Sequence, residues 1–457
     1  MNEQPVNVAR ISWRDLFPWT IIFKTLPIAV GIPVLVWASM GVVLTPVGWI
    51  IGEQIFITDE MRLEDPFLKE FAEINRSPYR SVFRATASET TSPEVLGSLL
   101  SGPSLVFENI TKPFRALFQA NWSPREYLYL FFGAVWALLV WAFAGCAISR
   151  VCILRLTRDE PLGLDEAFNF ACHKYKDCVG ALVMPLAAIA FLCIPLAMFG
   201  LLLGFDFGVA LAGIFWVFAL AASAVIAFLL LGLMFGWPLI VASISAEGQN
   251  SFDAVTRSFA YTFQRPLNYV LYIVVAILFG GFCWLIVSNV TNGIVDLSYW
   301  STSWGANRFG VEGYDDSVRR IDVVKGLIDP IPQTDQTPSV EGEPGIASEP
   351  PALSPFLNSG RRFIGFWNGI ARTLAAAFIH GLFWCMASAI YLLLRKDVDE
   401  TKMDEVYDVD EKRTYNLPPL KSDQHGVPQA QEPVPVDETA PTDASEVQEQ
   451  NDRSSTD

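Results

Sequence analysis

The chain keeps its charged residues and its long apolar runs in separate segments. Six runs of about 20 residues or more carry almost no charge, although the sequence has 48 acidic and 32 basic residues and is 52% hydrophobic. A helix of about 20 apolar residues crosses the roughly 30 Å hydrocarbon core of a bilayer. The predicted spans are residues 26–51, 127–148, 179–204, 209–234, 267–288 and 374–394.

These runs determine the expected fold class. Inside a bilayer each backbone amide needs a hydrogen-bond partner within the protein, and a helix supplies that partner from its own segment. We therefore predict an all-α fold, a polytopic transmembrane helix bundle of about six spans. The first run is longer than the core of a secretory signal, so we interpret it as a retained span.

Basic residues beside the spans predict the orientation of the bundle. Lys and Arg accumulate in the short cytoplasmic connections of membrane proteins. The N-terminal arm, residues 1–25, holds three basic residues, the connection 149–178 holds five, and Arg395 and Lys396 directly follow the last span. Both termini are therefore expected in the cytoplasm. The long segments at 53–125 and 291–362 are expected on the other side of the membrane.

Two connections on the cytoplasmic side have the pattern of amphipathic helices. In residues 238–266, Asn250 or Ser251 is expected to cap a helix that Pro266 then ends. Residues 161–179 follow the same plan, with acidic Asp165 and Glu166 early and basic Lys174 and Lys176 late. The repeated order of span, helix and span suggests an internal duplication. Few residues match between the two units, so the duplication is a hypothesis.

The segment 53–125 carries apolar stripes at helical spacing. We predict amphipathic helices there, one of them broken near Pro113. They either lie on the membrane surface or form a small packed outer domain, and the sequence leaves both readings open. In the second outer segment, residues 333–354 are rich in Pro, Ser and Glu and predict a flexible excursion. In the segment 53–125, the stripe of the helix that is expected to break near Pro113 consists of Val106, Phe107, Ile110, Phe114, Leu117 and Phe118.

The C-terminal segment, residues 395–457, is predicted to be a disordered acidic tail. From Asp397 onward it has 17 acidic and five basic residues, a net charge of −12 out of −16 for the whole chain. High net charge with few apolar groups is typical of disorder. Nucleic acid repels such a tail, so we expect no nucleic-acid partner. The tail is either a handle for a protein partner or a solubilising end.

Glycines recur every four residues in the third and fourth predicted spans. The spans are joined by only a few residues, so they are expected to form an antiparallel hairpin. Small residues at this spacing allow two membrane helices to approach closely. We therefore predict that these glycines serve close helix packing within the chain, which explains them more economically than dimerisation does. They are Gly200, Gly204, Gly208, Gly232 and Gly236.

Four basic residues are the candidates for contact with lipid headgroups. All four come from the two cytoplasmic segments, which would form one polar face if their helices are neighbours. Such a face at the inner leaflet would attract an anionic headgroup. The simpler alternative is that these residues only cap helices and anchor them on the cytoplasmic side. The candidates are Lys174, Lys176, Arg257 and Arg265.

The sequence contains no motif of a known catalytic or cofactor site. It has no H-E-x-x-H pair, no G-x-S-x-G turn, no P-loop and no G-x-G-x-x-G. Cys152, Cys172, His173 and Cys178 do not have the paired spacing of a zinc site. We therefore expect no catalytic residue, no metal and no cofactor.

Ionisable residues are almost absent from the predicted spans, which argues against ion-coupled transport. Only His380 falls within one, and a lone histidine in an apolar helix is expected to make a hydrogen bond to another helix. An enzyme is the third hypothesis. It would gain support if Asp165, His173 and Asp253 met around one cavity.

The stretch PLIVASISAEGQNSFDAVTRSFAYTFQRPLNYV, from Pro238 to Val270, begins just after the fourth predicted span and ends just inside the fifth. With its flanking spans it resembles bacterial multi-pass proteins related in layout to the membrane domain of glycerophosphodiester phosphodiesterases. The resemblance implies a protein of the bacterial inner membrane and supplies no catalytic residues. We expect a non-catalytic protein that organises the membrane or binds partners, with membrane lipids among them. The alternative is that the helix bundle transports or binds a lipid or amphiphile.

Overall fold

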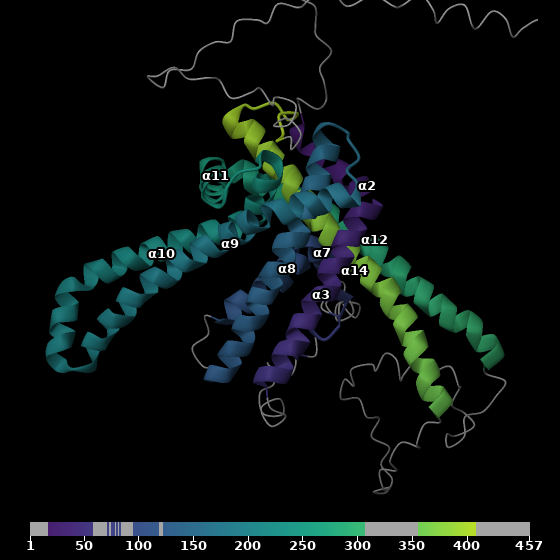
Figure 1. Cartoon of the computed structure of the whole chain (residues 1–457), viewed down its shortest axis with the longest axis horizontal. Helices are drawn as coiled ribbons and strands as arrows, with labels where there is room; N and C mark the ends of the chain where they lie inside the picture. Colours follow the sequence, from purple (N-terminus) through teal and green to yellow (C-terminus); the bar gives the residue numbers. More distant parts are fainter. Residues whose placement is uncertain are drawn as a thin grey trace, which may run out of the picture. The chain divides into compact units, whose positions relative to one another are not determined.

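The computed structural model describes residues 17–57, 71–72, 75–77, 79–80, 82–83, 95–117, 122–306 and 355–407. All of them belong to one compact unit, Met1–Tyr407, and within them the chain forms helices and no strand (Figure 1). The flexible excursion predicted at 333–354 and residues 408–457 of the predicted tail lie outside the described residues. The main elements are η1 (Pro18–Lys24), α2 (Thr25–Ala29), α3 (Ile32–Phe56), α7 (Val95–Leu117), α8 (Pro124–Thr157), α9 (Leu164–Leu201), η2 (Leu202–Gly204), α10 (Asp206–Glu247), α11 (Ser251–Gln264), α12 (Pro266–Ala306) and α14 (Pro355–Asp399).

Six of the described helices are long and apolar enough to cross a membrane. They are α3, α8, α9 with η2, α10, α12 and α14, and each overlaps one of the predicted spans. The predicted fold class, an all-α bundle with six membrane spans, is therefore confirmed.

The boundaries of these helices differ from the predicted ones. The cytoplasmic helix expected before residue 179 and the third span form one continuous helix, α9, of 38 residues. Likewise α10 continues through Pro238 to Glu247, well beyond the predicted end of the fourth span. Proline removes one helical hydrogen bond, but residues 236–246 are all buried, and their packing offsets that loss. Helix α10 stops at Gly248, which adopts the left-handed conformation with φ 63°.

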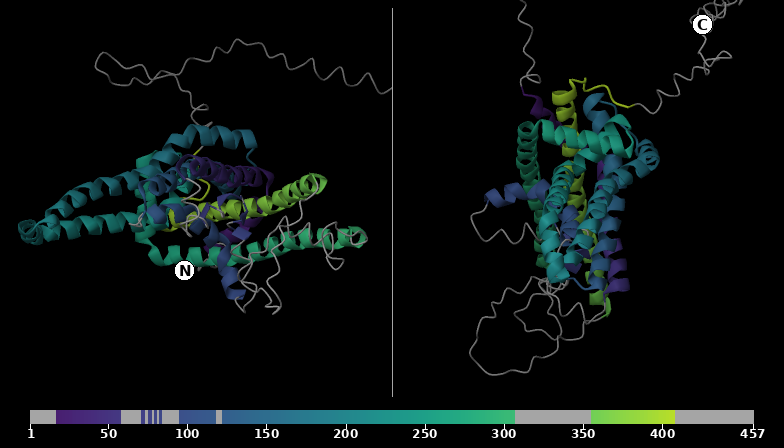
Figure 2. Two further views of the ribbon diagram at one scale, coloured as in Figure 1. Left: turned by 90° about the horizontal axis from the view of Figure 1, so that it is seen from below. Right: turned by 90° about the vertical axis from the view of Figure 1, so that its left-hand side faces the viewer.

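The predicted start and end signals around α11 are correct. The side chain of Asn250 accepts a hydrogen bond from the Asp253 backbone N–H at 3.0 Å, which caps the helix. Helix α11 ends at Gln264, and Pro266 opens α12. Seen end-on in Figure 1 and lengthwise in the right-hand view of Figure 2, α11 lies across its neighbours near one end of the bundle.

Helix α12 is longer than predicted. It runs to Ala306, so the first residues of the segment expected at 291–362 continue the fifth span as helix. At the other end of that segment, α14 already begins at Pro355. The residues between these two helices lie outside the described part of the chain.

Two tryptophans and two glycines join α3 to α8. A Cβ atom added to Gly48 of α3 would lie 2.0 Å from the Trp136 ring of α8. Reciprocally, a Cβ on Gly133 of α8 would lie 2.0 Å from the ring of Trp49 on α3. Each ring thus occupies the space that a glycine leaves on the other helix. This close packing aligns α3 and α8 as an antiparallel pair.

The glycines predicted to pack within the chain do so only in part, and none of them packs α9 against α10. A Cβ on Gly200 or Gly204 would meet nothing within 4 Å, and Gly208 faces its own turn at Leu202. Gly232 instead makes room for the ring of Phe259 on α11, 2.5 Å from an added Cβ. The most apolar 18-residue windows of the two spans are only 6% and 0% buried. Most of the hairpin seen in Figure 2 therefore leaves its apolar side chains exposed, as is expected of helices that face lipid.

The largest departure from expectation concerns α7, which comes from the segment predicted to lie outside. This helix packs against α12, α8 and α14, as neither a surface helix nor part of an outer domain. A Cβ on Gly102 would lie 2.9 Å from the backbone oxygen of Gly280, within the fifth span. The predicted break at Pro113 is also absent, because α7 continues through it. Within its stripe Val106 and Ile110 are buried, whereas Phe118 lies outside the described residues.

Candidate functional site

Helix α7 forms one wall of an apolar cavity of about 540 Å³. Helices α8, α9, α10 and α14 supply the other walls, so four of the six spans contribute to it. The lining is almost entirely aliphatic and aromatic. Among its side chains are Phe107, Ile110 and Phe114 of α7, Leu138 and Trp141 of α8, Leu182 and Leu186 of α9, Leu230, Leu233 and Trp237 of α10, and Trp384 of α14.

The charged and hydroxyl side chains that line this cavity all come from one stripe of α7. Glu108, Thr111 and Arg115 follow at intervals of three and four residues, which places them on one side of the helix. Arg115 Nη2 lies 3.7 Å from Glu108 Oε1, and both side chains are more than half exposed. The Thr111 hydroxyl donates to the Phe107 carbonyl at 2.8 Å. The cavity therefore combines an apolar interior with one positively and one negatively charged side chain that are both accessible.

A second apolar cavity of about 220 Å³ lies on the other side of Phe107. Phe107 lines both cavities. Along α10, Leu230 to Trp237 line the larger one and Phe235 to Leu239 line the smaller one. The smaller cavity is therefore nearer the C-terminus of α10. Between them the Phe107 and Trp237 ring centroids are 5.9 Å apart, and those of Trp237 and Phe383 are 5.7 Å apart.

A third, much smaller cavity of about 50 Å³ lies beside His380. The imidazole stacks on Trp141 with ring centroids 4.9 Å apart, and its Nδ1 is 2.7 Å from the Ala376 carbonyl of its own helix. The hydrogen bond to another helix that the sequence predicted is thus replaced by one within α14. Asn109 of α7 also lines this cavity, and its buried Nδ2 has no hydrogen-bond partner among the described residues.

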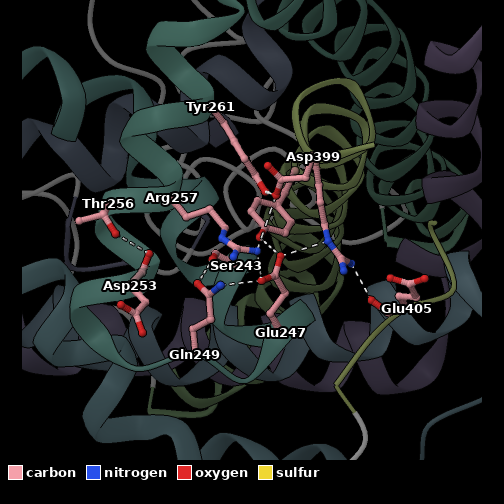
Figure 3. A network of polar contacts seen from close by, with 11 residues as sticks. Ser243, Glu247, Gln249, Asp253, Thr256, Arg257, Tyr261, Asp399 and Glu405 are labelled. Atoms are coloured by element: carbon pink, nitrogen blue, oxygen red, sulfur yellow. Dashed lines mark hydrogen bonds and ion pairs between the residues drawn. The ribbon is translucent and has the colours of Figure 1, made fainter. Parts of the chain in front are cut away.

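A cluster of charged residues joins the C-terminal ends of α10 and α14 to α11 (Figure 3). Glu247 is at its centre and its side chain is only 12% exposed. The carboxylate pairs with Arg257 of α11 and with Arg395 Nε of α14 at 3.1 Å, and it accepts the Tyr391 hydroxyl at 2.6 Å. We call this end of the bundle the polar end.

A second carboxylate extends the cluster. Asp399 accepts a hydrogen bond from the Tyr261 hydroxyl and lies 3.7 Å from Arg257 Nη1. Burial, together with the hydrogen bond to Asp399, raises the pKa of Tyr261, so its hydroxyl remains a donor at neutral pH. Burial alone would lower the pKa of Arg257. The hydrogen bond to Glu247 and the negative charge of that carboxylate outweigh burial and raise the pKa of Arg257. The contacts of Asp399 therefore hold α11 against α14, and the pair of Arg257 with Glu247 holds α11 against α10.

Residues 401–407 form a strap across the polar end. Three successive carbonyls accept hydrogen bonds from arginines: Glu405 from Arg395 at 2.7 Å, Val406 from Arg158 at 2.9 Å and Tyr407 from Arg150 at 2.7 Å. The Tyr407 N–H donates to the Ala246 carbonyl near the end of α10 at 2.9 Å. The strap thereby connects α8, α10 and α14 just before the predicted acidic tail.

The four candidate headgroup residues fall into two groups. Arg257 is paired with Glu247, and Lys174 donates to the Gly248 carbonyl at 2.6 Å and pairs with Asp177. These two side chains serve contacts within the protein. Arg265 and Lys176 are exposed. The sequence could not indicate the pairing of Arg257, because its partners Glu247 and Asp399 come from other helices.

The residues considered for metal or enzyme chemistry do not form a site. Asp165 and His173 lie on exposed positions of α9, and Asp253 is exposed in the first turn of α11. Within the described residues no group of three or more His, Cys, Asp or Glu side chains is placed to hold a metal ion. Cys172 is exposed, whereas Cys152 and Cys178 are buried.

The cavity residues of α7 were missed as functional candidates from the sequence. The apolar stripe with Phe107 and Phe114 was recognised, but it was assigned to an outer surface helix or domain. A usable signal was the polar stripe of Glu108, Thr111 and Arg115 running beside it. Ionisable groups held at membrane depth are functional candidates, and this stripe reaches the bundle with α7.

The fold and the cavity define the class of this protein as a multi-pass α-helical membrane protein. Comparison with known proteins adds no narrower assignment: no family model, no curated protein and no solved structure matches the chain. The resemblance to the membrane domain of glycerophosphodiester phosphodiesterases stays a prediction.

Proposed function

We propose that this protein binds a membrane lipid, or another amphiphile, with an acyl chain in the larger cavity. The observation that carries the proposal is the 540 Å³ cavity between α7 and four spans, with charges only along one edge. Ligand cavities in proteins commonly measure about 300–1,000 Å³ and combine an apolar lining with few polar groups. In a membrane bundle, the molecules surrounding such a cavity are lipids.

The surrounding bilayer determines which interactions can give the protein affinity for its ligand. An acyl chain gains little hydrophobic free energy on moving from lipid into an apolar cavity, because both surroundings are equally oily. Affinity must therefore come from two other sources. One is close packing of the chain against the cavity wall, whose contacts are missing when the cavity is empty, and the other is polar contacts. Arg115 offers planar donors suited to a phosphate, and Glu108 is an acceptor for an amine or hydroxyl. The polar stripe is thus our candidate for headgroup selection.

The other expected role, organising the membrane or recruiting protein partners, depended on the acidic tail. Residues 408–457 lie outside the described residues. That role therefore stays a prediction. Lipid binding is the function that the described residues support better, because its cavity and its charges are both defined.

We also propose the bacterial inner membrane as the location, with the polar end of the bundle in the cytoplasm. Arg150, Arg158, Lys174 and Arg395 all lie at that end, in agreement with the bias of cytoplasmic segments toward basic residues. Exposed Cys172 of α9 is a natural reporter of this side. We expect an impermeant maleimide to label it only after the cells are opened. Labelling in intact cells would contradict the orientation.

A cavity-filling substitution tests lipid binding. Leu186→Trp places a larger ring in the 540 Å³ cavity and should displace the acyl chain. Co-purified lipid, measured by native mass spectrometry of protein in a mild detergent, should fall about tenfold, which corresponds to about 1.4 kcal/mol. Leu201→Trp is the matched control on the same helix, since Leu201 is 75% exposed and lines neither apolar cavity. Equal lipid retention by both variants and the unaltered protein would refute the proposed site.

A further inference from the structure

Phe107 separates two apolar cavities that otherwise adjoin each other. It lines the 540 Å³ cavity with Phe114 and the 220 Å³ cavity with Pro103 and Ser104, one turn earlier on α7. Its ring lies against Trp237, and Trp237 lies against Phe383. Trp237 and Phe383 are themselves less than a tenth exposed. The partition therefore consists of three rings, and Phe107 is the one that belongs to α7.

The two compartments differ in their access to polar groups. Arg115 lines the larger cavity, eight residues after Phe107, which corresponds to roughly 12 Å along a helix. The smaller cavity lies nearer the polar end, and its lining is apolar apart from Ser104 and Tyr269. The Tyr269 hydroxyl is already occupied, because it donates to the Phe235 carbonyl. The smaller compartment is thus suited to a methyl end and unsuited to a headgroup.

From this arrangement we propose that Phe107 limits the length of the acyl chain that the protein accepts. The occupant is the acyl chain of a phospholipid, whose phosphate complements the charge of Arg115 at the edge of the larger cavity. The chain extends from that edge toward Phe107 and ends against its ring. The smaller cavity stays closed to it as long as the ring is in place. This inference rests on the proposed lipid binding and adds the residue that determines its chain selectivity.

Removing the ring should join the compartments. For Phe107→Ala, we expect the acyl chains of bound phospholipid to become longer, with the ratio of long to short chains rising severalfold. The measurement is native mass spectrometry of protein purified in mild detergent and exchanged into nanodiscs of mixed phosphatidylglycerols with different chain lengths. Phe143→Ala is the matched control, because Phe143 is a partly buried phenylalanine of α8 that lines neither cavity. It should leave the chain-length distribution unchanged.

A second substitution tests whether the added length enters the smaller cavity. Ala276 of α12 lines only that cavity, so Ala276→Phe should fill it. We expect Ala276→Phe alone to leave the bound lipids unchanged, and the double variant with Phe107→Ala to restore the original chain lengths. The inference is overturned if Phe107→Ala gives no lengthening, if Phe143→Ala lengthens the chains equally, or if Ala276→Phe alone shortens them. Absence of any bound lipid in the unaltered protein would instead refute the proposed function.

Discussion

Glu247→Ala is expected to reduce the free energy of unfolding by about 3–5 kcal/mol, the usual cost of removing one partner from a buried ion pair. The substitution leaves Arg395, whose side chain is only 9% exposed, without its carboxylate. Arg257 loses its closest partner as well and keeps only Asp399 at 3.7 Å. The Tyr391 hydroxyl loses its acceptor. One substitution therefore loosens α10, α11 and α14 together.

The measurement is denaturant-induced unfolding in detergent micelles, followed by tryptophan fluorescence. Glu160→Ala is the control, because Glu160 is exposed in the connection between α8 and α9, and its loss should cost less than about 0.5 kcal/mol. Glu247→Gln should fall between the two, since an amide can still accept from Tyr391 but does not balance the arginines. If Glu247→Ala costs no more than the Glu160 control, the polar end does not depend on this carboxylate.

Features that depend only on residues close to one another in the sequence could be predicted from it. The six spans follow from local apolar content, since a run of this length has to satisfy its own backbone in lipid. The cap at Asn250 and the stop at Pro266 follow from the chemistry of those residues alone. Their contacts lie within a few residues, so no knowledge of the tertiary fold was needed.

The position of α7 could not be predicted in the same way. Buried positions such as Val106 and Ile110 recur with the same spacing whether a helix faces lipid, an outer domain or the bundle. What distinguishes these cases is the approach of Gly102 to Gly280, which are 178 residues apart in the sequence. Because that contact positions α7, which lines both apolar cavities, the candidate site was missed along with it.

The charge cluster at the polar end shows a similar limit. Arg257 was assigned to lipid headgroups because it lies in an amphipathic helix predicted on the cytoplasmic side of the membrane. Its partners are Glu247 at the end of α10 and Asp399 at the end of α14. Each acidic residue appeared in the sequence as part of a separate connection or tail. Only the meeting of three helix ends makes them one network.

The account depends most on the position of α7, and a cross-link between α7 and α12 should form in nearly every molecule. Ser104 and Ala276 line the same 220 Å³ cavity from these two helices. In a variant whose seven native cysteines are replaced, Ser104→Cys and Ala276→Cys should therefore be joined by a short, membrane-permeant dimaleimide. The linked peptides are detected by mass spectrometry of protein treated in its native membranes.

The matched control pairs Ser104→Cys with Gly213→Cys of α10, a position where an added side chain would meet nothing within 4 Å. This pair should give no link under the same conditions. A helix on the membrane surface would behave differently, because the thiol introduced by Ser104→Cys would be open to water. If α7 lies within the bundle, the link between positions 104 and 276 forms, and an impermeant maleimide leaves the thiol at position 104 unmodified. Absence of that link, together with rapid labelling of the same thiol from solution, would contradict the position of α7 and the cavity that it encloses.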